Sequence, residues 1–163
     1  MGKNIIIING TGGAGKDTFV SFCAEVEKVL NISTVDKVKE AAAILVGWNG
    51  EKDEVSRKLL VDLKQLSIAY NDAPTKYICG MAEKFKDSED NLMFIHIREA
   101  EEIEKAKKLL NAKTLLITNP RVQLITSNNS DGKVNEYKYD YYIQNDGTLE
   151  DLKEKAKKFV EEL

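Results

Sequence analysis

A run of four isoleucines near the start of the chain gives the first structural signal. Ile5–Ile8 lies between the polar residues Asn4 and Asn9, and its β-branched side chains are typical of a strand buried on both faces of a parallel sheet. A glycine-rich stretch follows. Apolar residues then recur at helical spacing and predict one core-facing helical stripe, made of Phe19, Phe22, Cys23, Val26, Val29 and Leu30.

Further strands are predicted by short apolar runs along the rest of the chain. They are Asn31–Thr34, Asn91–Ile97, Lys113–Thr118 and the stretch Tyr139–Gln144. Helical patterns separate these runs, and this alternation predicts an α/β fold in three layers. Its centre would be a doubly wound parallel sheet of about five strands.

The helical parts differ greatly in length. Residues 36–87 are expected to be almost wholly helical, with breaks at Gly47, Gly50 and Pro74. Glu99–Leu110 predicts a helix, and its Lys and Glu residues at i,i+4 spacing indicate a solvated face, as in Glu101 with Lys105 and Glu104 with Lys108. Thr148 and Asp151 have the spacing of a capping box before a last helix.

Length and pattern together indicate a single domain, residues 1–163. Within it, residues 36–90 form a helical excursion, and residues 120–139 form a polar segment placed like a short lid. The stretch Ser127–Gly132 is the most loop-like part of that segment.

Composition narrows the class of partner. The net charge of -3 and the pI near 5.4 provide no broad basic surface, which argues against nucleic acid or an anionic membrane as partner. Apolar runs are too short to span a bilayer, and "MGKN" leads directly into a strand, so a cytoplasmic location is expected. Cys23 and Cys79 lack metal-type spacing and indicate reduced thiols. The oligomeric state cannot be predicted.

The stretch "NGTGGAGKDT", residues 9–18, carries the candidate chemistry. Its glycines allow backbone amides to wrap a phosphate, the following helix offers its N-terminus, and Lys16 can reach outer phosphates. A plain turn is the alternative to a phosphate loop. A dinucleotide loop is another, because "GTGGAG" also fits G-x-G-x-x-G and Asp36 lies near the acidic position of that motif.

Residues 5–18 resemble the phosphate loop of the nucleoside monophosphate kinase group, whose members have the P-loop NTPase fold. "AGKDT" is most similar to bacteriophage-type deoxynucleoside monophosphate kinases and animal-type phosphomevalonate kinases. The resemblance implies ATP as cofactor, with Mg²⁺ held by nucleotide and water and Thr18 as the nearest hydroxyl. It also implies a set of nucleotide-binding residues, namely Gly10, Gly12, Gly13, Ala14, Gly15, Lys16, Asp17, Thr18, Asn145 and Gly147.

Only three of the 24 basic residues are arginines, which makes Arg57, Arg98 and Arg121 informative. A guanidinium fork suits bidentate phosphate binding, although surface ion pairs are the alternative role. Arg98 follows a predicted strand at the edge where doubly wound folds bind ligands. Arg121 stands at the start of the lid-like segment, and Arg57 lies in the helical excursion.

The resemblance extends along much of the chain. Val38–Ala42 with Ser56–Leu63 is similar to phosphomevalonate-kinase stretches, His96–Ile103 to their arginine region, and Tyr141–Leu152 to the adenine-bordering end of many group members. It implies ATP-dependent phosphoryl transfer to a small phosphorylated acceptor, most simply a nucleoside or deoxynucleoside monophosphate.

In that scheme the catalytic residues are Lys16, Asp17, Arg98 and Arg121, and the acceptor is held by Lys39, Arg57 and Arg98. A phosphomevalonate-type acceptor is an alternative. His96 stands where relatives often have an aspartate, and the lid-like segment starts with a single arginine. These departures also leave open a nucleotide-binding regulatory protein without transfer activity, and a structural or a ligand-contacting role for His96.

Overall fold

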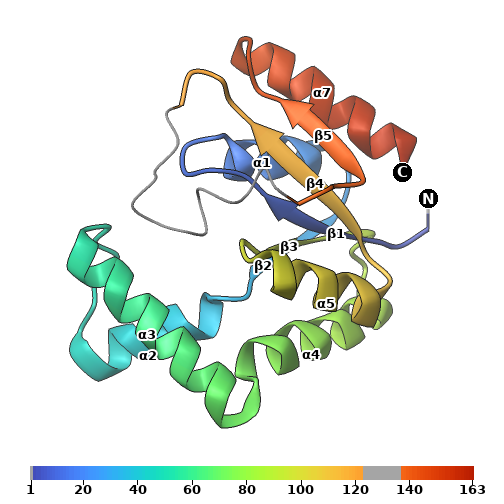
Figure 1. Ribbon diagram of the computed structural model, residues 1–163. Helices are drawn as coiled ribbons and strands as arrows, with labels where there is room; N and C mark the ends of the chain where they lie inside the picture. Colours follow the sequence, from blue (N-terminus) through green and yellow to red (C-terminus); the bar gives the residue numbers. More distant parts are fainter. Residues whose placement is uncertain (1, 123–136) are drawn as a thin grey trace.

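The computed structural model describes residues 2–122 and 137–163. Strands and helices alternate along most of this chain (Figure 1). In chain order they are β1 (Asn4–Asn9), α1 (Lys16–Val26), β2 (Val29–Ser33), α2 (Asp36–Val46), α3 (Glu54–Asn71), α4 (Ala73–Asp87), β3 (Leu92–His96), α5 (Ala100–Leu110), β4 (Lys113–Thr118), β5 (Tyr141–Gln144) and α7 (Leu149–Glu162).

The five strands form one parallel sheet in the order β2-β3-β1-β4-β5, which confirms the predicted fold class. β1 is central, and Ile8 is in register with His96 of β3 and Leu115 of β4. Because all strands are parallel, their carboxyl ends meet at one edge of the sheet. The loops that follow β1, β2, β3 and β4 therefore converge there.

Helices cover both faces of the sheet (Figure 1). Ile6 and Ile8 point to the face on which α1 and α7 pack, whereas Ile7 points to the face covered by α4 and α5. This alternation follows from the two-residue period of a strand. It explains the isoleucine run, because each of these side chains is fully buried in one of two separate cores.

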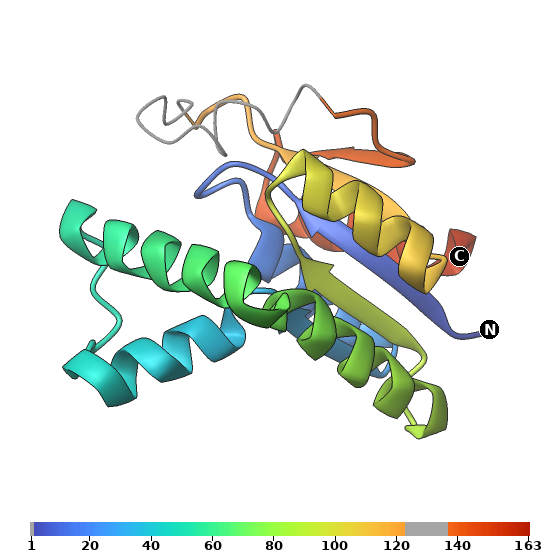
Figure 2. The same cartoon turned by 60° about the horizontal axis from the view of Figure 1, so that its bottom comes forward.

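The long helical excursion consists of three helices. α2 and α3 form a hairpin that projects beyond the sheet from the carboxyl end of β2, and α4 returns along the sheet (Figure 2). Gly47 ends α2 in the left-handed conformation (φ 68°), as predicted for a break. The second break lies at Asp72 (φ 54°), and Pro74 stands in the first turn of α4, where proline is favoured.

One part of the predicted helical stripe was wrong. α1 ends at Val26, and Val29 and Leu30 belong to β2, which begins two residues before the predicted strand. The chain turns extended at Glu27, and Val29 and Leu30 pair with Leu92 and Met93 of β3. A short apolar run fits both the helical and the strand period, and pairing with the free edge of β3 made these residues a strand.

Two local predictions can be compared with the structure directly, the capping box of the last helix and the ion pairs on α5. Thr148 and Asp151 form the predicted reciprocal capping box at the start of α7. Of the two ion pairs expected on α5, Glu104 and Lys108 are 3.7 Å apart, but Lys105 instead binds Asp72. The predicted loop Ser127–Gly132 lies outside the described residues.

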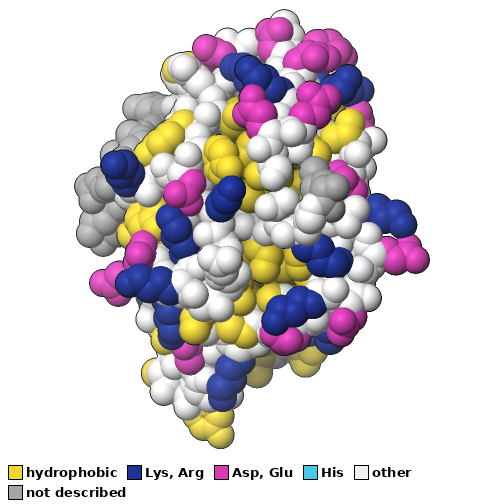
Figure 3. Space-filling model, turned by 90° about the vertical axis from the view of Figure 1, so that its right-hand side faces the viewer, with side chains coloured by type: hydrophobic (Ala, Val, Ile, Leu, Met, Phe, Trp, Pro, Cys, Tyr) yellow, Lys and Arg dark blue, Asp and Glu magenta, His cyan; other side chains and the backbone are white. Residues whose placement is uncertain are grey.

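The face seen in Figure 3 carries acidic and basic side chains side by side, with small apolar patches between them. Cys23 is buried in the core as predicted, and burial raises the pKa of its thiol to about 12. Within the described residues, no helix combines the length and apolar character that crossing a membrane requires.

Candidate functional site

The loop between β1 and α1 lies at the central strand end and is closed around Lys16. Lys16 Nζ donates to the carbonyl of Gly10 over 2.6 Å and lies 3.4 Å from that of Thr11. The amide of Ala14 donates to the carbonyl of Thr11, which tightens the turn. The ammonium group is thus held inside the curve of the loop, where a bound anion would meet it.

Two glycines make this loop possible. A Cβ on Gly10 would lie 2.5 Å from the backbone carbonyl oxygen of Ile117, so no side chain fits there. Gly15 adopts φ 101° and precedes α1 without providing a side-chain cap. The first-turn amides of Lys16, Asp17 and Thr18 therefore have no capping side chain, and the helix dipole adds to their attraction for an anion.

The turn at Asn145 and Gly147, for which an adenine-bordering role was predicted, lies beside this loop. The side chain of Asn145 donates from Nδ2 to the carbonyl of Ala14 over 3.0 Å. The backbone amide of Asn145 donates to the carbonyl of Thr118 over 2.6 Å. The guanidinium of Arg121 donates from Nη2 to the carbonyls of Asn145 and Gly147 at 3.4 and 3.1 Å. Arg121 thus lies on the β5 side of the loop in this conformation.

His96 ends β3 beside the loop and is neutral. Burial lowers its pKa to about 4, and the charges of Asp17, Lys16, Asp36 and Lys39 also act on it. The first turn of α1, with Lys16 and Asp17, and the start of α2, with Asp36 and Lys39, therefore lie near the end of β3. His96 Nε2 lies 2.8 Å from Oδ1 of Asn31, which fits a neutral ring donating from Nε2. This bond between β2 and β3 supports the structural role for His96.

The depressed pKa of His96 predicts how stability depends on pH. Between about pH 6.5 and pH 4 the unfolded chain binds a proton that the folded chain does not, so the free energy of unfolding falls as the pH falls. His96→Gln keeps a side-chain donor but cannot titrate. We expect the wild-type protein to lose about 1–3 kcal/mol more than His96→Gln between pH 7.5 and pH 4.5.

Urea unfolding of both proteins at the two pH values measures this difference. Other titrating groups cancel in the comparison, because both proteins contain them. Parallel stability curves for the two proteins would contradict a depressed pKa at His96.

The three residues expected to hold the acceptor are not equally close to the loop. Arg98 directly follows β3 and Ile97, and its carbonyl accepts a bond from Asn9 Nδ2 at the end of β1. Lys39 lies in the first turn of α2, near His96. Arg57 lies in the first turn of α3, where its charge acts on Asp53. The ribbon shows α2 and α3 joined at the outer end of their hairpin (Figure 2).

A cavity of about 190 Å³ lies where the end of α3 and the beginnings of α4 and α5 meet the sheet edge. Its lining combines Thr34 after β2 and Ile97 after β3 with residues of α3, α4 and α5. Glu102, one of the lining residues, lies 2.9 Å from Lys64 of α3, and their side chains are only 24% and 12% exposed. This ion pair joins α3 to α5 beside the cavity.

Breaking that pair is expected to destabilise the protein strongly. Lys64→Met leaves the Glu102 carboxylate without its partner in a poorly hydrated position, and about 2–4 kcal/mol of stability should be lost. Lys58→Met is the matched control on the same helix, because the Lys58–Asp62 pair is exposed and worth at most about 0.5 kcal/mol.

Urea unfolding measures both losses, and equal losses would contradict the special role of the Lys64–Glu102 pair. The double variant Lys64→Met with Glu102→Leu should recover most of the loss, because no unpaired charge remains.

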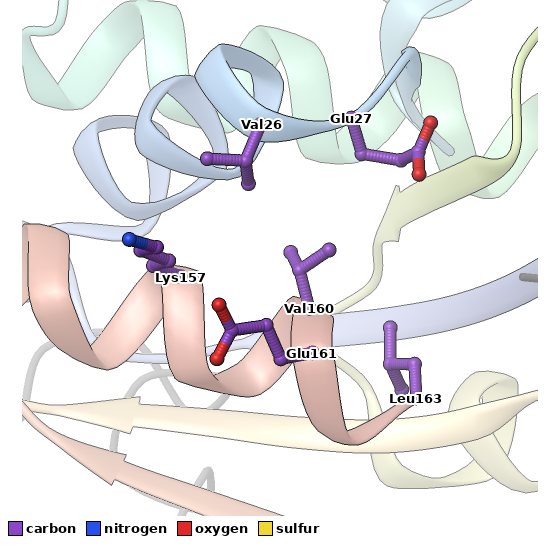
Figure 4. A pocket seen from close by; sticks show the side chains of 6 residues that line it. All are labelled: Val26, Glu27, Lys157, Val160, Glu161 and Leu163. Carbon is purple, nitrogen blue, oxygen red and sulfur yellow. The ribbon is translucent and has the colours of Figure 1, made fainter.

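A larger pocket of about 420 Å³ lies elsewhere, between the carboxyl ends of α1 and α7 (Figure 4). Val26 and Val160 line it, and Lys157 and Glu161 stand at its side. Helices in this fold run opposite to the strands, so their carboxyl ends lie at the amino edge of the sheet. The pocket therefore takes no part in the phosphate loop.

The strand order excludes the dinucleotide alternative. That arrangement places the second strand directly beside the first, whereas here β3 separates β2 from β1. Asp36 has a structural role, because its Oδ2 accepts bonds from the amide of Ser33 and the hydroxyl of Tyr77.

Two site features were missed from the sequence. Asn9 was interpreted only as a strand boundary, although its side chain reaches three different segments of the chain. The Lys64–Glu102 pair joins residues 38 positions apart, and only the tertiary structure brings them together.

Comparison with known proteins identifies the fold. No family model matches the sequence, and no curated protein matches it significantly. Solved structures do match over nearly their whole length. TT1252 from Thermus thermophilus is 21% identical at a TM-score of 0.57, with 100% of this chain and 99% of that chain covered.

Dephospho-CoA kinase from Campylobacter jejuni is 16% identical, with a TM-score of 0.54 and coverage of 98% and 97%. Shikimate kinase from Aquifex aeolicus is 13% identical, with a TM-score of 0.51 and coverage of 97% and 96%. The chain thus has the α/β fold of these P-loop kinases, as the sequence resemblance implied.

The residues of the loop fit a polyphosphate. The site combines uncapped helix amides with the ammonium of Lys16, which is held inside the loop, and the close approach of Gly10 to the carbonyl of Ile117 fixes where the loop begins. The protein provides fewer ligands for a divalent metal ion than for a phosphate. No cluster of three or more His, Cys, Asp or Glu suited to a metal occurs among the described residues. An ion bound here would rely on phosphate oxygens, water and the hydroxyl of Thr18.

Proposed function

We propose that the protein is an ATP-dependent kinase that transfers the γ-phosphoryl group to a small phosphorylated acceptor. The observation that carries this proposal is the convergence at one sheet edge. The loop around Lys16 follows β1, and Arg98 follows β3 directly after Ile97, which lines the cavity. Lys39 of α2 lies near enough to the end of β3 for its charge to act on His96. The fold shared with dephospho-CoA kinase and shikimate kinase supports the same class of reaction.

ATP would lie with its phosphates on the amides of residues 12, 13 and 15–17, and with its adenine near the turn at Asn145 and Gly147. Lys16 would hold the β- and γ-phosphates. Mg²⁺ would neutralise charge on the phosphate oxygens, with Thr18 on the metal or α-phosphate side. Asp17 would orient the acceptor or a metal-bound water.

The acceptor would place its phosphate at Arg98 and Lys39 and its body in the cavity between α3, α4 and α5. An oxygen of that phosphate would bond to the γ-phosphorus while the bond to the β-γ bridging oxygen breaks, leaving ADP. No general base is needed because the acceptor is already anionic. Arg121 would leave Asn145 and Gly147 to cover the transferring group, and Arg57 would join if the α2–α3 hairpin tilts inward.

A nucleoside or deoxynucleoside monophosphate is our first choice of acceptor, since the loop "AGKDT" resembles such kinases. A phosphomevalonate-type acceptor is the second choice on the same motif. A regulatory protein that binds nucleotide without transfer is favoured by His96, because neutral imidazole is a poor magnesium partner at the strand end.

A coupled assay of ADP release separates these functions. Purified protein is incubated with ATP, Mg²⁺ and a panel of nucleoside monophosphates and phosphomevalonate. A kinase raises ADP release at least about tenfold over the acceptor-free rate with one of them. ATP binding in a thermal-shift assay without ADP release on any acceptor would reject the kinase and support the regulatory function.

A further inference from the structure

The side chain of Asn9 joins three segments that meet at the candidate site. Its Oδ1 accepts a bond from the amide of Gly10 over 2.8 Å. Its Nδ2 donates to the carbonyl of Arg98 over 3.1 Å and to the hydroxyl of Tyr139 over 3.0 Å. Both hydrogens of the amide group are therefore used, and the side chain has one orientation that satisfies all its partners.

These bonds are made in a dry environment. Asn9 is 1% exposed and Tyr139 is 4% exposed. Tyr139 is itself fixed, because its ring packs on those of Tyr137 and Tyr142 and its amide donates to the Tyr142 hydroxyl. Buried hydrogen bonds of this kind resist displacement, since losing one partner leaves a desolvated polar group.

The partners of Asn9 belong to opposite sides of the proposed reaction. Gly10 is the first residue of the loop that would hold the donor phosphates, and Arg98 would bind the acceptor phosphate. Because the planar amide group of Asn9 contacts the backbone at both Gly10 and Arg98, it sets the spacing between these two segments. Phosphoryl transfer depends on positioning more than on covalent chemistry, so such a spacing matters to rate and binding.

We propose that Asn9 is a positioning residue that holds the start of the phosphate loop and the chain at Arg98 in fixed register, with Tyr139 orienting its amide group. This proposal rests on the proposed kinase function for its acceptor half. Its donor half requires only that the loop binds ATP.

Three variants remove different bonds. Asn9→Leu removes all three at similar volume. Asn9→Asp keeps an acceptor for the Gly10 amide and a partner for Tyr139, but it cannot donate to the carbonyl of Arg98 when ionised. Tyr139→Phe removes one hydroxyl and keeps the ring. Asn91→Leu is the matched control, because the Asn91 amide group bonds to Glu27 at the opposite edge of the sheet.

Each variant is tested for the Kd of ATP by calorimetry, for the KM of the nucleoside monophosphate that wild-type protein uses best, and for Tm. Asn9→Leu should raise both constants about tenfold or more. Asn9→Asp should raise the acceptor KM about tenfold and change the ATP Kd less than threefold. Tyr139→Phe should raise both constants about threefold. Asn91→Leu should lower Tm alone.

A purely structural role would make Asn9→Leu behave like Asn91→Leu, with a lower Tm and unchanged Kd and KM, and that result overturns the proposal. If the wild-type protein binds ATP but phosphorylates no acceptor, the kinase function fails separately. The Kd of ATP then tests the positioning role alone. A tenfold higher Kd in Asn9→Leu supports this role, and an unchanged Kd rejects it.

Discussion

Lys16→Ala is expected to reduce kcat/KM for ATP by about 10²–10³-fold, equivalent to about 3–4 kcal/mol of transition-state stabilisation. The ammonium of Lys16 lies inside the phosphate loop, 2.6 Å from the carbonyl of Gly10. It is therefore placed to meet charge that develops on the transferring group. No neighbouring side chain of the loop can replace this charge, because the rest of the loop is glycine, alanine and threonine.

Initial rates of ADP release with varied ATP measure this effect. Lys3→Ala is a matched control, because Lys3 Nζ also binds backbone carbonyls, those of Phe85, Ser88 and Asp90, but at the amino edge of the sheet. It should lower Tm and leave kcat/KM within about twofold. Turnover of Lys16→Ala within threefold of wild type would remove the loop from the proposed mechanism.

Arg98→Ala is expected to raise the KM of the acceptor by about a hundredfold while the ATP Kd stays within threefold of wild type. Arg98 follows β3, outside the loop that would bind ATP, and beside Ile97 of the acceptor cavity. Charge-assisted bidentate bonds to phosphate are worth about 2–3 kcal/mol, which corresponds to this change.

Arg98→Lys tests the geometry of that contact. Lysine restores the charge without the planar fork, so its acceptor KM should lie between those of wild type and Arg98→Ala. Rates with varied acceptor at saturating ATP, together with ATP thermal shifts, give both constants. An equal loss of ATP and acceptor binding in Arg98→Ala would contradict its assignment to the acceptor side.

Local signals in the sequence were strong for the opening of the chain. The isoleucine run, the glycines and Lys16 predicted a strand, a glycine-rich loop and a helix, and the structure has β1 and α1 on either side of Gly10–Gly15. The capping box at Thr148 and Asp151 was equally readable, since both partners lie within one helical turn. In each case the determining contacts are between near neighbours.

Contacts between distant residues were not readable in this way. Val29 and Leu30 fit a helical stripe by spacing, but pairing with β3 placed them in a strand. Lys105 was expected to pair within its helix, yet Asp72, 33 positions away, is its partner. Spacing along the chain also could not predict how far Arg57 lies from Arg98: Arg57 stands in the first turn of α3, and its role at the acceptor stays a prediction.

The sequence by itself thus determined the class of fold and the glycine-rich turn between β1 and α1, because periodicity and local backbone geometry specify both. Only the tertiary structure decided which residues surround the loop. The strand order excluded the dinucleotide arrangement, burial made His96 neutral, and tertiary packing joined Asn9 at the end of β1 to Arg98 after β3 and to Tyr139 before β5. Desolvation and long-range hydrogen bonds depend on what the folded chain places nearby, which no local pattern records.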